Sequence, residues 1–275
     1  MAWPSRAPQP LPSFNLCDRQ GNHNDQHVLL LRQRGRRLSM TRTIAITGAS
    51  RGIGRAAADA LASDGWTIIG IARSKPQSFP GRFIEADLAD HQHTDVVAED
   101  LVADGHVVGI VNNVGMALHE TIDRVDLKVF ATLMDLNVRP ALQLTQALLP
   151  GMRAAQFGRI VNITSLVTRG LAYRSSYAAA KAALESITRT MAIELAEDGI
   201  TANAVAPGPT ETELFRANNP RGSKGEARYL SNVPMRRLAH SSEIAAAIAF
   251  LASKSAAYIT GQTLFVDGGA SLGSL

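Results

Sequence analysis

From residue 43 onward, short runs of apolar residues alternate with longer segments in which apolar and polar residues mix. The apolar runs predict seven strands, at residues 43–47, 66–72, 82–86, 107–111, 159–163, 201–205 and 263–266. Helices are predicted at residues 56–62, 127–155, 175–196 and 242–251. Strands that are apolar throughout and separated by helices are typical of a parallel sheet covered on both faces. The pattern therefore predicts an α/β protein with a single doubly wound, Rossmann-like sheet.

Two places depart from this regular alternation. Only nine residues, 73–81, join the second and third predicted strands. That length is tight for a helical crossover between parallel strands, so we expect a shortened or absent helix there. In the long helix, Pro140 has no backbone N–H to donate, so the sequence predicts a bend or break near it.

Residues 1–40 differ from the rest of the chain. Prolines cluster early, arginines gather before Met40, and no helical or strand period is sustained, so we expect a disordered basic leader. It has three explanations: an arginine-rich targeting presequence, a basic tail for an acidic partner, or a start assigned upstream of Met40 as the true first residue. We favour the third, because a strand begins directly after Met40. Residues 41–275 are expected to form one catalytic domain.

Charge and composition narrow the function classes. Residues 1–39 carry six arginines and two acids, whereas the remainder has 22 basic and 22 acidic residues. The body therefore has no overall nucleic-acid signature, and no nucleic-acid partner is expected. No run approaches ~18 consecutive apolar residues, so no membrane span is expected. A lone cysteine, Cys17, rules out an internal disulfide and suits the cytoplasm, where we expect the protein.

A glycine-rich turn directly follows the first predicted strand. It reads Thr47-Gly48-Ala49-Ser50-Arg51-Gly52-Ile53-Gly54, with glycines spaced G-x-x-x-G-x-G. Glycines allow a tight turn and let backbone N–H groups approach a pyrophosphate, while the following helix directs its positive end at that anion. A glycine trio alone is weak evidence, but its place between a strand and a helix indicates a dinucleotide site.

This segment resembles the T-G-x-x-x-G-x-G motif of classical short-chain dehydrogenases/reductases, and the resemblance extends from about Thr41 to Gly269. It implies a nicotinamide-dependent oxidoreductase that interconverts a carbonyl and an alcohol. It also implies further cofactor contacts, at Asp87 and Leu88, Asn113 and Gly115, Pro207 and Gly208, and Thr210 and Thr212.

The end of the second strand indicates which nicotinamide cofactor is used. An acid there holds the ribose 2′-OH of NAD, whereas an arginine nearby accommodates the 2′-phosphate of NADP. This chain reads Ile71-Ala72-Arg73-Ser74, with no acid. Arg73, together with Arg51 in the glycine turn, therefore predicts NADP(H).

The candidate catalytic group is a tyrosine. Tyr177 and Lys181 form Y-x-x-x-K on a predicted helix, which places them on one face. An ammonium beside a phenol favours the phenolate, so we expect Lys181 to lower the pKa of Tyr177. The resemblance adds Ser165, to bind the substrate carbonyl, and Asn137, to support a water link to the lysine. Tyr177 is then the general acid/base, with Ser165 and Lys181 steadying the reacting oxygen.

The substrate is less clearly marked. Residues 209–238 suit a mobile lid, and the loop 166–176 is expected to line the other side of the site. Many relatives are 3-oxoacyl-acyl-carrier-protein reductases with basic residues for the acidic carrier, but this chain has Gln156 and Asp198 at the matching places. We therefore favour a free small or medium carbonyl compound. The carrier-protein reaction remains the alternative, since three arginines lie nearby: Arg153, Arg159 and Arg174.

Other classes of protein remain open. The fold could serve as a dinucleotide sensor or scaffold with vestigial catalysis, although the tyrosine and the lysine are both present. A nucleic-acid binder acting through the basic leader is a further alternative. His91 and His93 have no third ligand in view, so no metal site is expected. The resemblance implies a homo-oligomer, a dimer or tetramer built through the long helices and the last strand.

Overall fold

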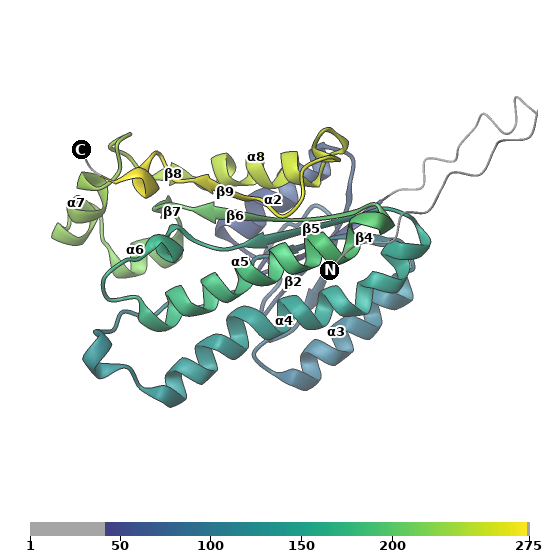
Figure 1. Cartoon of the computed structure of the whole chain (residues 1–275), viewed down its shortest axis with the longest axis horizontal. Helices are drawn as coiled ribbons and strands as arrows, with labels where there is room; N and C mark the ends of the chain where they lie inside the picture. The colour runs from purple at the N-terminus through teal and green to yellow at the C-terminus, as the bar shows by residue number, and fades with distance from the viewer. Residues whose placement is uncertain (1–41, 274–275) are drawn as a thin grey trace, which may run out of the picture. The chain divides into compact units, whose positions relative to one another are not determined.

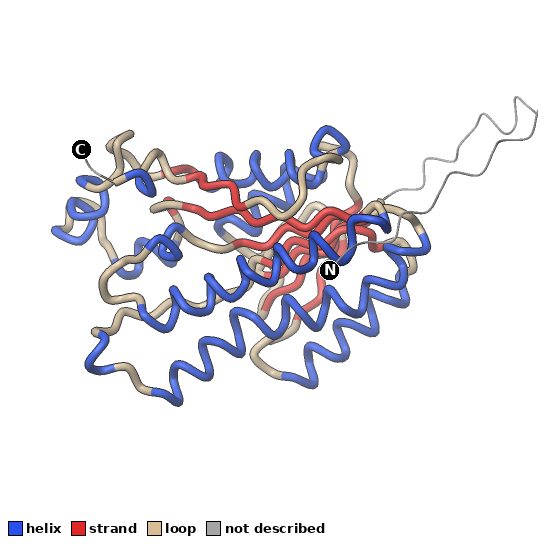
Figure 2. The backbone as a smooth tube through the Cα atoms, viewed as in Figure 1, coloured by secondary structure: helices blue, strands red, loops and turns tan. Residues whose placement is uncertain are grey.

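The computed structural model describes residues 42–273, which lie within one compact unit. At its centre is a seven-stranded sheet with the order β3-β2-β1-β4-β5-β6-β9 and parallel pairing throughout (Figures 1 and 2). The strands are β1 (Thr43–Thr47), β2 (Thr67–Ala72), β3 (Arg82–Glu85), β4 (Val107–Asn112), β5 (Gly158–Ile163), β6 (Ile200–Pro207) and β9 (Thr263–Val266). The predicted doubly wound, Rossmann-like fold is confirmed, and all seven predicted strands are present.

Helices cover both faces of this sheet (Figure 1). One face carries α2 (Gly52–Ser63) and α8 (Ser241–Ala252), and the other carries α3 (His91–Asp104), α4 (Leu127–Ala154) and α5 (Ser175–Leu195). Successive residues of β1 show the division, because Ile44 and Ile46 belong to the core under α2 and α8, whereas Ala45 belongs to the core under the other three helices. Apolar side chains on both faces of each central strand thus fix the three layers.

Smaller elements complete the chain. The segment after β6 holds β7 (Thr210–Glu211), α6 (Glu213–Asn218), α7 (Lys224–Ser231) and β8 (Ala239–His240), and β7 pairs in parallel with β8. Single 3-10 turns lie at Ile122–Arg124, Leu166–Arg169, Ala196–Asp198, Lys254–Ala256 and Ala270–Leu272.

The two irregular places have different outcomes. No helix forms in residues 73–81, as predicted from the short connection between β2 and β3. Of the predicted bend or break near Pro140, the break is wrong, because α4 is one helix of 28 residues that contains both Pro140 and Pro150. Pro140 is buried, and α4 packs against α3 and α5, so tertiary packing outweighs the missing hydrogen bond. The expected disordered leader, residues 1–40, lies outside the described residues.

The strand order reverses between β1 and β4, which are neighbours in the sheet although β2 and β3 lie between them in the chain. Crossovers on opposite faces of the sheet leave a crevice beyond the carboxyl ends of the strands at such a point, and ligands bind there. Among residues 42–273, no helix is both long enough and apolar enough to cross a bilayer.

Candidate active site

The glycine turn lies at the carboxyl end of β1. Gly48 and Gly52 adopt left-handed φ angles of +66° and +55°, which favour glycine. Gly54 is buried at the start of α2, and a Cβ there would clash with the carbonyl of Gly48 and lie 2.6 Å from Asn113 Nδ2. The turn is therefore a cradle with room for a pyrophosphate only because these positions carry no side chain.

A second turn, after β4, is bonded to this cradle. The Thr47 hydroxyl accepts hydrogen bonds from the backbone N–H groups of Asn113 (2.9 Å) and Val114 (3.0 Å). In return, the Asn113 amide donates to the carbonyls of Thr47 (3.0 Å) and Gly48 (3.2 Å). These four bonds tie together the two strand ends that flank the crevice.

Two arginines border the crevice without a counter-charge. Arg51 precedes α2 and Arg73 follows β2, and both side chains are exposed. Neither forms an ion pair with any residue between 42 and 273. Ser50 and Ile53, also predicted to contact the cofactor, are half-buried in the same turn. This edge can therefore accept an anionic group such as a ribose phosphate.

The predicted adenine contacts follow β3. Asp87 holds a tight turn, with its carboxylate accepting from the backbone N–H of Ala89 at 3.1 Å. Leu88 is buried in the core under α3 and α4, and its carbonyl accepts a 2.8 Å hydrogen bond from Arg139. Leu88 therefore supports the crevice through its buried side chain and its bonded backbone.

Three predicted residues meet at Gly115. A Cβ on Gly115 would lie 2.5 Å from Asn137 Oδ1 and 3.1 Å from Lys181 Nζ. The Asn137 amide donates to the carbonyls of Met116 (3.0 Å) and Leu133 (2.9 Å), while its Oδ1 is buried without a partner. Buried polar atoms normally have a partner, so this oxygen marks a position where a water or ligand donor fits.

Lys181 is buried beside this group, with 2 % of its surface exposed. Its ammonium donates a 2.8 Å hydrogen bond to the Ile163 carbonyl at the end of β5 and lies 5.8 Å from the centre of the Tyr177 ring. Burial lowers the pKa of Lys181 from 10.5 to about 8, because a charged amine loses hydration there.

Tyr177 and Ser165 are brought together by the loop between β5 and α5. Burial raises the pKa of Tyr177, while a hydrogen bond with Ser165 and the positive charge of Arg174 lower it in part. The expected lowering of the tyrosine pKa by Lys181 is therefore not found. Loss of hydration outweighs the favourable groups, and the cation that acts on this phenol is Arg174.

The loop after β6 borders the glycine turn. A Cβ on Gly208 would lie 2.6 Å from Asp267 Cα, so only glycine fits between β6 and the end of β9. Thr210 donates to the Gly208 carbonyl at 2.9 Å, and the Thr212 hydroxyl accepts from Phe215 N at 3.1 Å as the cap of α6. The Thr212 methyl would lie 3.3 Å from a Cβ on Gly52, so this loop reaches the cradle. Pro207, also predicted as a contact, is the last residue of β6.

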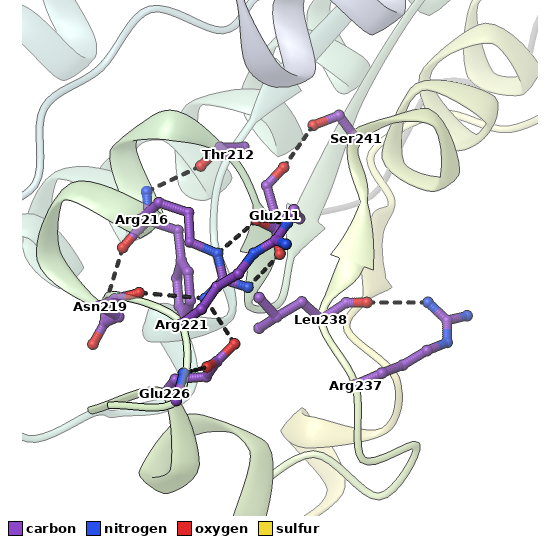
Figure 3. Close-up of polar contacts among 11 residues, drawn as sticks. Glu211, Thr212, Arg216, Asn219, Arg221, Glu226, Arg237, Leu238 and Ser241 are labelled. Carbon is purple, nitrogen blue, oxygen red and sulfur yellow. Dashed lines mark hydrogen bonds and ion pairs between the residues drawn. The ribbon is translucent and has the colours of Figure 1, made fainter. Parts of the chain in front are cut away.

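The segment expected as a lid contains ordered elements joined by charges. Arg216 of α6 forms ion pairs with Glu211 of β7 and with Glu226 of α7, the latter at 2.7 Å (Figure 3). The Ser241 hydroxyl donates to the Glu211 carbonyl at 3.2 Å. The pKa of Glu211 is lowered, chiefly by its hydrogen bond with Arg216. A single guanidinium thus connects three elements over the crevice side of the sheet.

Two of the arginines weighed for carrier-protein docking, Arg153 and Arg159, lie near the other end of α4 and α5. Arg153 pairs with Asp198 at 2.8 Å, so its charge is compensated. Arg159 is 3 % exposed and bonds to backbone carbonyls, so it presents no guanidinium on the surface. Of the three nearby arginines, only Arg174 faces the site.

From the sequence, Arg174 was expected in the loop that lines the site and among the arginines near a carrier protein, and Thr47 was not among the expected contacts. Thr47 could have been predicted from the sequence, because it is the first residue of the glycine motif and ends a predicted strand. Arg174 carried a weaker signal, a charge one helical turn before Tyr177. Among residues 42–273 there is no group of three or more histidine, cysteine or acidic residues that could hold a metal.

Fold and geometry together define a dinucleotide-binding α/β protein with a tyrosine and a lysine beside the nucleotide cradle. Residues 48–271 match a family model described as enoyl-(acyl carrier protein) reductase. The chain belongs to the classical short-chain dehydrogenase/reductase family, and it is an oxidoreductase of that family.

Individual relatives agree with this assignment. The chain is 38% identical over 234 residues to the 3-oxoacyl-[acyl-carrier-protein] reductase FabG of Vibrio harveyi, covering 82% of this chain and 95% of the relative. The Escherichia coli FabG is 39% identical over the same shares. A solved structure from Beutenbergia cavernae, named as an NAD(P)-dependent gluconate 5-dehydrogenase with bound NADP, is 33% identical, with a TM-score of 0.78, 83% of this chain and 96% of that chain covered.

Proposed function

We propose that this protein is an NADP(H)-dependent oxidoreductase that interconverts a carbonyl and an alcohol, with Tyr177 as the general acid/base. The observation that carries the proposal is the placement of Tyr177, on which Ser165 acts, and of the buried Lys181 at one crevice, beside a glycine cradle. Nicotinamide, when bound, supplies or accepts the hydride. The vestigial sensor is disfavoured, because Tyr177, Ser165 and Lys181 all converge on this crevice.

The residues of this chain fit the cofactor. Gly48, Ser50, Gly52, Ile53 and Gly54 would hold the pyrophosphate against the start of α2. Arg51 and Arg73 would pair with a 2′-phosphate, since both are exposed and free of ion pairs with residues 42–273. The bound NADP of the Beutenbergia cavernae relative supports this preference. The remaining contacts are proposed at Asp87, Leu88, Asn113, Gly115, Pro207, Gly208, Thr210 and Thr212.

Tyr177 is the proton donor or acceptor in both directions of the proposed reaction. In reduction, Tyr177 donates its proton to the oxygen of the substrate as negative charge develops there, and Ser165 donates a hydrogen bond to the same oxygen. Lys181 stabilises the resulting phenolate as a cation held by the Ile163 carbonyl. Asn137 supports a water link to Lys181 through its unpartnered Oδ1. Lys181 then returns a proton to the Tyr177 phenolate and regains one from solvent through the water that Asn137 holds.

The substrate we favour is a free small or medium carbonyl compound. The support is the surface at the far end of α4 and α5, where Asp198 neutralises Arg153 and Arg159 is buried. The second candidate is a 3-oxoacyl-acyl-carrier-protein reductase, which the two FabG relatives favour. The two differ in whether a carrier protein lowers KM.

NADPH oxidation decides between these candidates. The purified full chain is assayed against a panel of free aldehydes, ketones and oxo acids, and against one 3-oxoacyl group on carrier protein and on a short thiol. We expect turnover of free compounds and less than a tenfold gain from the carrier. A gain above a hundredfold would establish the carrier reaction, and no turnover of any member would contradict the proposal.

We also propose a homo-oligomer in the cytoplasm. Large apolar side chains are exposed on the elements expected at the interface, at Ile193 of α5, Phe250 of α8 and Leu264 of β9. Burial of such side chains against a second copy is favourable. Light scattering of the purified chain tests the assembly, and a monomer at micromolar concentration would contradict it.

A further inference from the structure

Arg174 precedes α5 and is only half-buried between two other elements. Its Nη1 donates to the Leu118 carbonyl at 2.9 Å, and its Nη2 donates to the Tyr229 hydroxyl of α7 at 2.9 Å. Both acceptors are neutral. A guanidinium has five N–H donors, so three donors remain for a further partner.

This cation has no counterion. Within residues 42–273, Arg174 takes part in no ion pair. Glu120, the acid whose backbone pairs with it, is engaged elsewhere, because its carboxylate accepts a 2.8 Å hydrogen bond from Ser176 N. A partly desolvated charge without a partner is unfavourable, so an arriving anion would be stabilised here.

The position of Arg174 relates this charge to the reacting group. Its carbonyl accepts from Ala178 N at 2.7 Å, the first bond of α5, so Arg174 lies one helical turn before Tyr177. Its positive charge acts on the Tyr177 hydroxyl. We therefore expect that one small molecule can place an anionic group on Arg174 and a carbonyl on Tyr177.

We propose that Arg174 binds the carboxylate of an oxo-acid substrate and so determines the specificity of this site. The inference rests on the proposed function and narrows its substrate class. A carboxylate matches the planar guanidinium and neutralises its single charge. A phosphate dianion would leave net negative charge beside Tyr177, whose hydroxyl must itself become negative when it gives up its proton.

Neighbouring groups hold the guanidinium in place. Tyr173 has a left-handed φ of +66°, and its ring stacks on His119 at 4.9 Å between centroids. Arg228 of α7 lies 5.5 Å from the centre of the Tyr173 ring. Together with the bond from Arg174 to Tyr229, these contacts fix the residue pair 173–174 between the Leu118 loop and α7.

A pair of matched substrates tests this proposal. 3-Oxobutanoate and its methyl ester offer the same ketone, with and without a negative charge. The measured quantity is kcat/KM for the acid divided by kcat/KM for the ester, with NADPH saturating. We expect Arg174→Gln to lower this ratio at least ~10-fold, because a site built to pair a substrate group loses its preference when the pairing group is removed.

Two further variants distinguish bidentate pairing by the guanidinium from a general effect of positive charge near the site. Arg174→Lys keeps the charge without the bidentate fork, so the ratio falls by less than in Arg174→Gln. Lys224→Gln removes an exposed positive charge from α7 that takes no part in these contacts, and it leaves the ratio within twofold. Thermal melting and NADPH fluorescence establish that each variant is folded, and if Arg174→Gln does not fold, the Arg174→Lys ratio decides.

The outcomes are distinguishable. A ratio that stays within twofold of wild type in both Arg174 variants overturns the inference, as does an equal loss in Lys224→Gln. If wild type reduces the ester and the ratio does not depend on Arg174, the oxidoreductase proposal stands and only the carboxylate assignment fails. If wild type reduces neither compound nor any other member of the carbonyl panel, both proposals fail together.

Discussion

The Lys181 ammonium donates a 2.8 Å hydrogen bond to the carbonyl of Ile163, the last residue of β5. This bond fixes a lysine from the middle of α5 against the strand end that also leads to Ser165. The ammonium lies in a buried position where its pKa is lowered to about 8. Although this cation is costly to bury, it is held 5.8 Å from the centre of the Tyr177 ring, where it would stabilise the proposed phenolate.

Removal of the Tyr177 hydroxyl tests the proton-transfer role. We expect Tyr177→Phe to lower kcat by roughly 10²–10⁴-fold, the usual contribution of a positioned acid or base. NADPH affinity changes little, because the ring remains. Tyr173→Phe, at a neighbouring tyrosine outside the helix, is the matched control and retains activity. Steady-state kinetics with fluorescence titration of NADPH measure both effects, and a kcat near wild type in Tyr177→Phe would remove the proposed acid.

The cofactor preference is tested at Arg73. Arg73→Ala is expected to raise KM for NADPH by about 10-fold or more and to leave KM for NADH nearly unchanged, since only NADPH carries the 2′-phosphate. The effect weakens as salt concentration rises, because the arginine is exposed. Arg82→Ala, at an exposed arginine that pairs with Asp100, is the control. An equal change for both nucleotides would contradict the assignment.

Alanine substitutions at two helical glycines, Gly54 in the cradle and Gly151 in α4, are expected to have opposite effects on stability. A Cβ on Gly54 meets the Gly48 carbonyl and Asn113, whereas a Cβ on Gly151 of α4 meets nothing within 4 Å. We expect Gly54→Ala to lower the free energy of unfolding by about 1–3 kcal/mol and to abolish nucleotide binding. Gly151→Ala should raise it by about 0.5–1 kcal/mol, the helix propensity gained. Urea denaturation measures both, and a stabilised Gly54→Ala would contradict the packing described.

The lowered pKa of Lys181 predicts how stability depends on pH. The unfolded chain binds this proton up to about pH 10.5 and the folded chain only up to about pH 8, so folding releases a proton between them. Stability from this group therefore rises as pH increases from 8 toward 10.5, by up to about 3 kcal/mol. Lys181→Met removes that rise.

Urea denaturation of both proteins between pH 7 and pH 9.5 checks this prediction, and the tyrosines that begin to titrate at the upper end are the same in both proteins. The difference between wild type and Lys181→Met isolates the lysine from other groups. At pH 7 the variant is expected to be the more stable protein, because no charge is buried. Parallel stability curves for the two proteins would show that Lys181 does not titrate in this range.

The carboxylate assignment at Arg174 makes one prediction beyond kinetics. If an oxo acid bridges Arg174 and Tyr177, its binding also fixes Tyr229 and hence α7. We expect 3-hydroxybutanoate, with NADP bound, to slow hydrogen exchange in residues 224–231, and Arg174→Gln to remove that protection. Protection that persists in the variant would place the acid elsewhere.

Much of the architecture was determined locally. Seven apolar runs became seven strands, and the central ones, β1, β4, β5 and β6, are buried along almost their whole length, as continuous apolar runs require. The glycine turn was readable because Gly48 and Gly52 need a left-handed backbone and Gly54 has no room for a Cβ. Tyr177 and Lys181 share a face through helical spacing alone.

Only the tertiary structure determined the properties that depend on several elements at once, namely the continuity of α4, the pKa of Tyr177 and the contacts of Arg174. α4 continues through Pro140 because its neighbours pack around it, a contribution that no local propensity contains. The pKa of Tyr177 moves upward because surrounding segments remove its water, and this outweighs the lowering by Ser165 and by the positive charge of Arg174. Arg174 meets Leu118 and Tyr229 across 56 and 55 residues of chain, respectively. Local sequence fixes backbone geometry and helical neighbours, whereas hydration and long-range contacts are set only when the layers assemble.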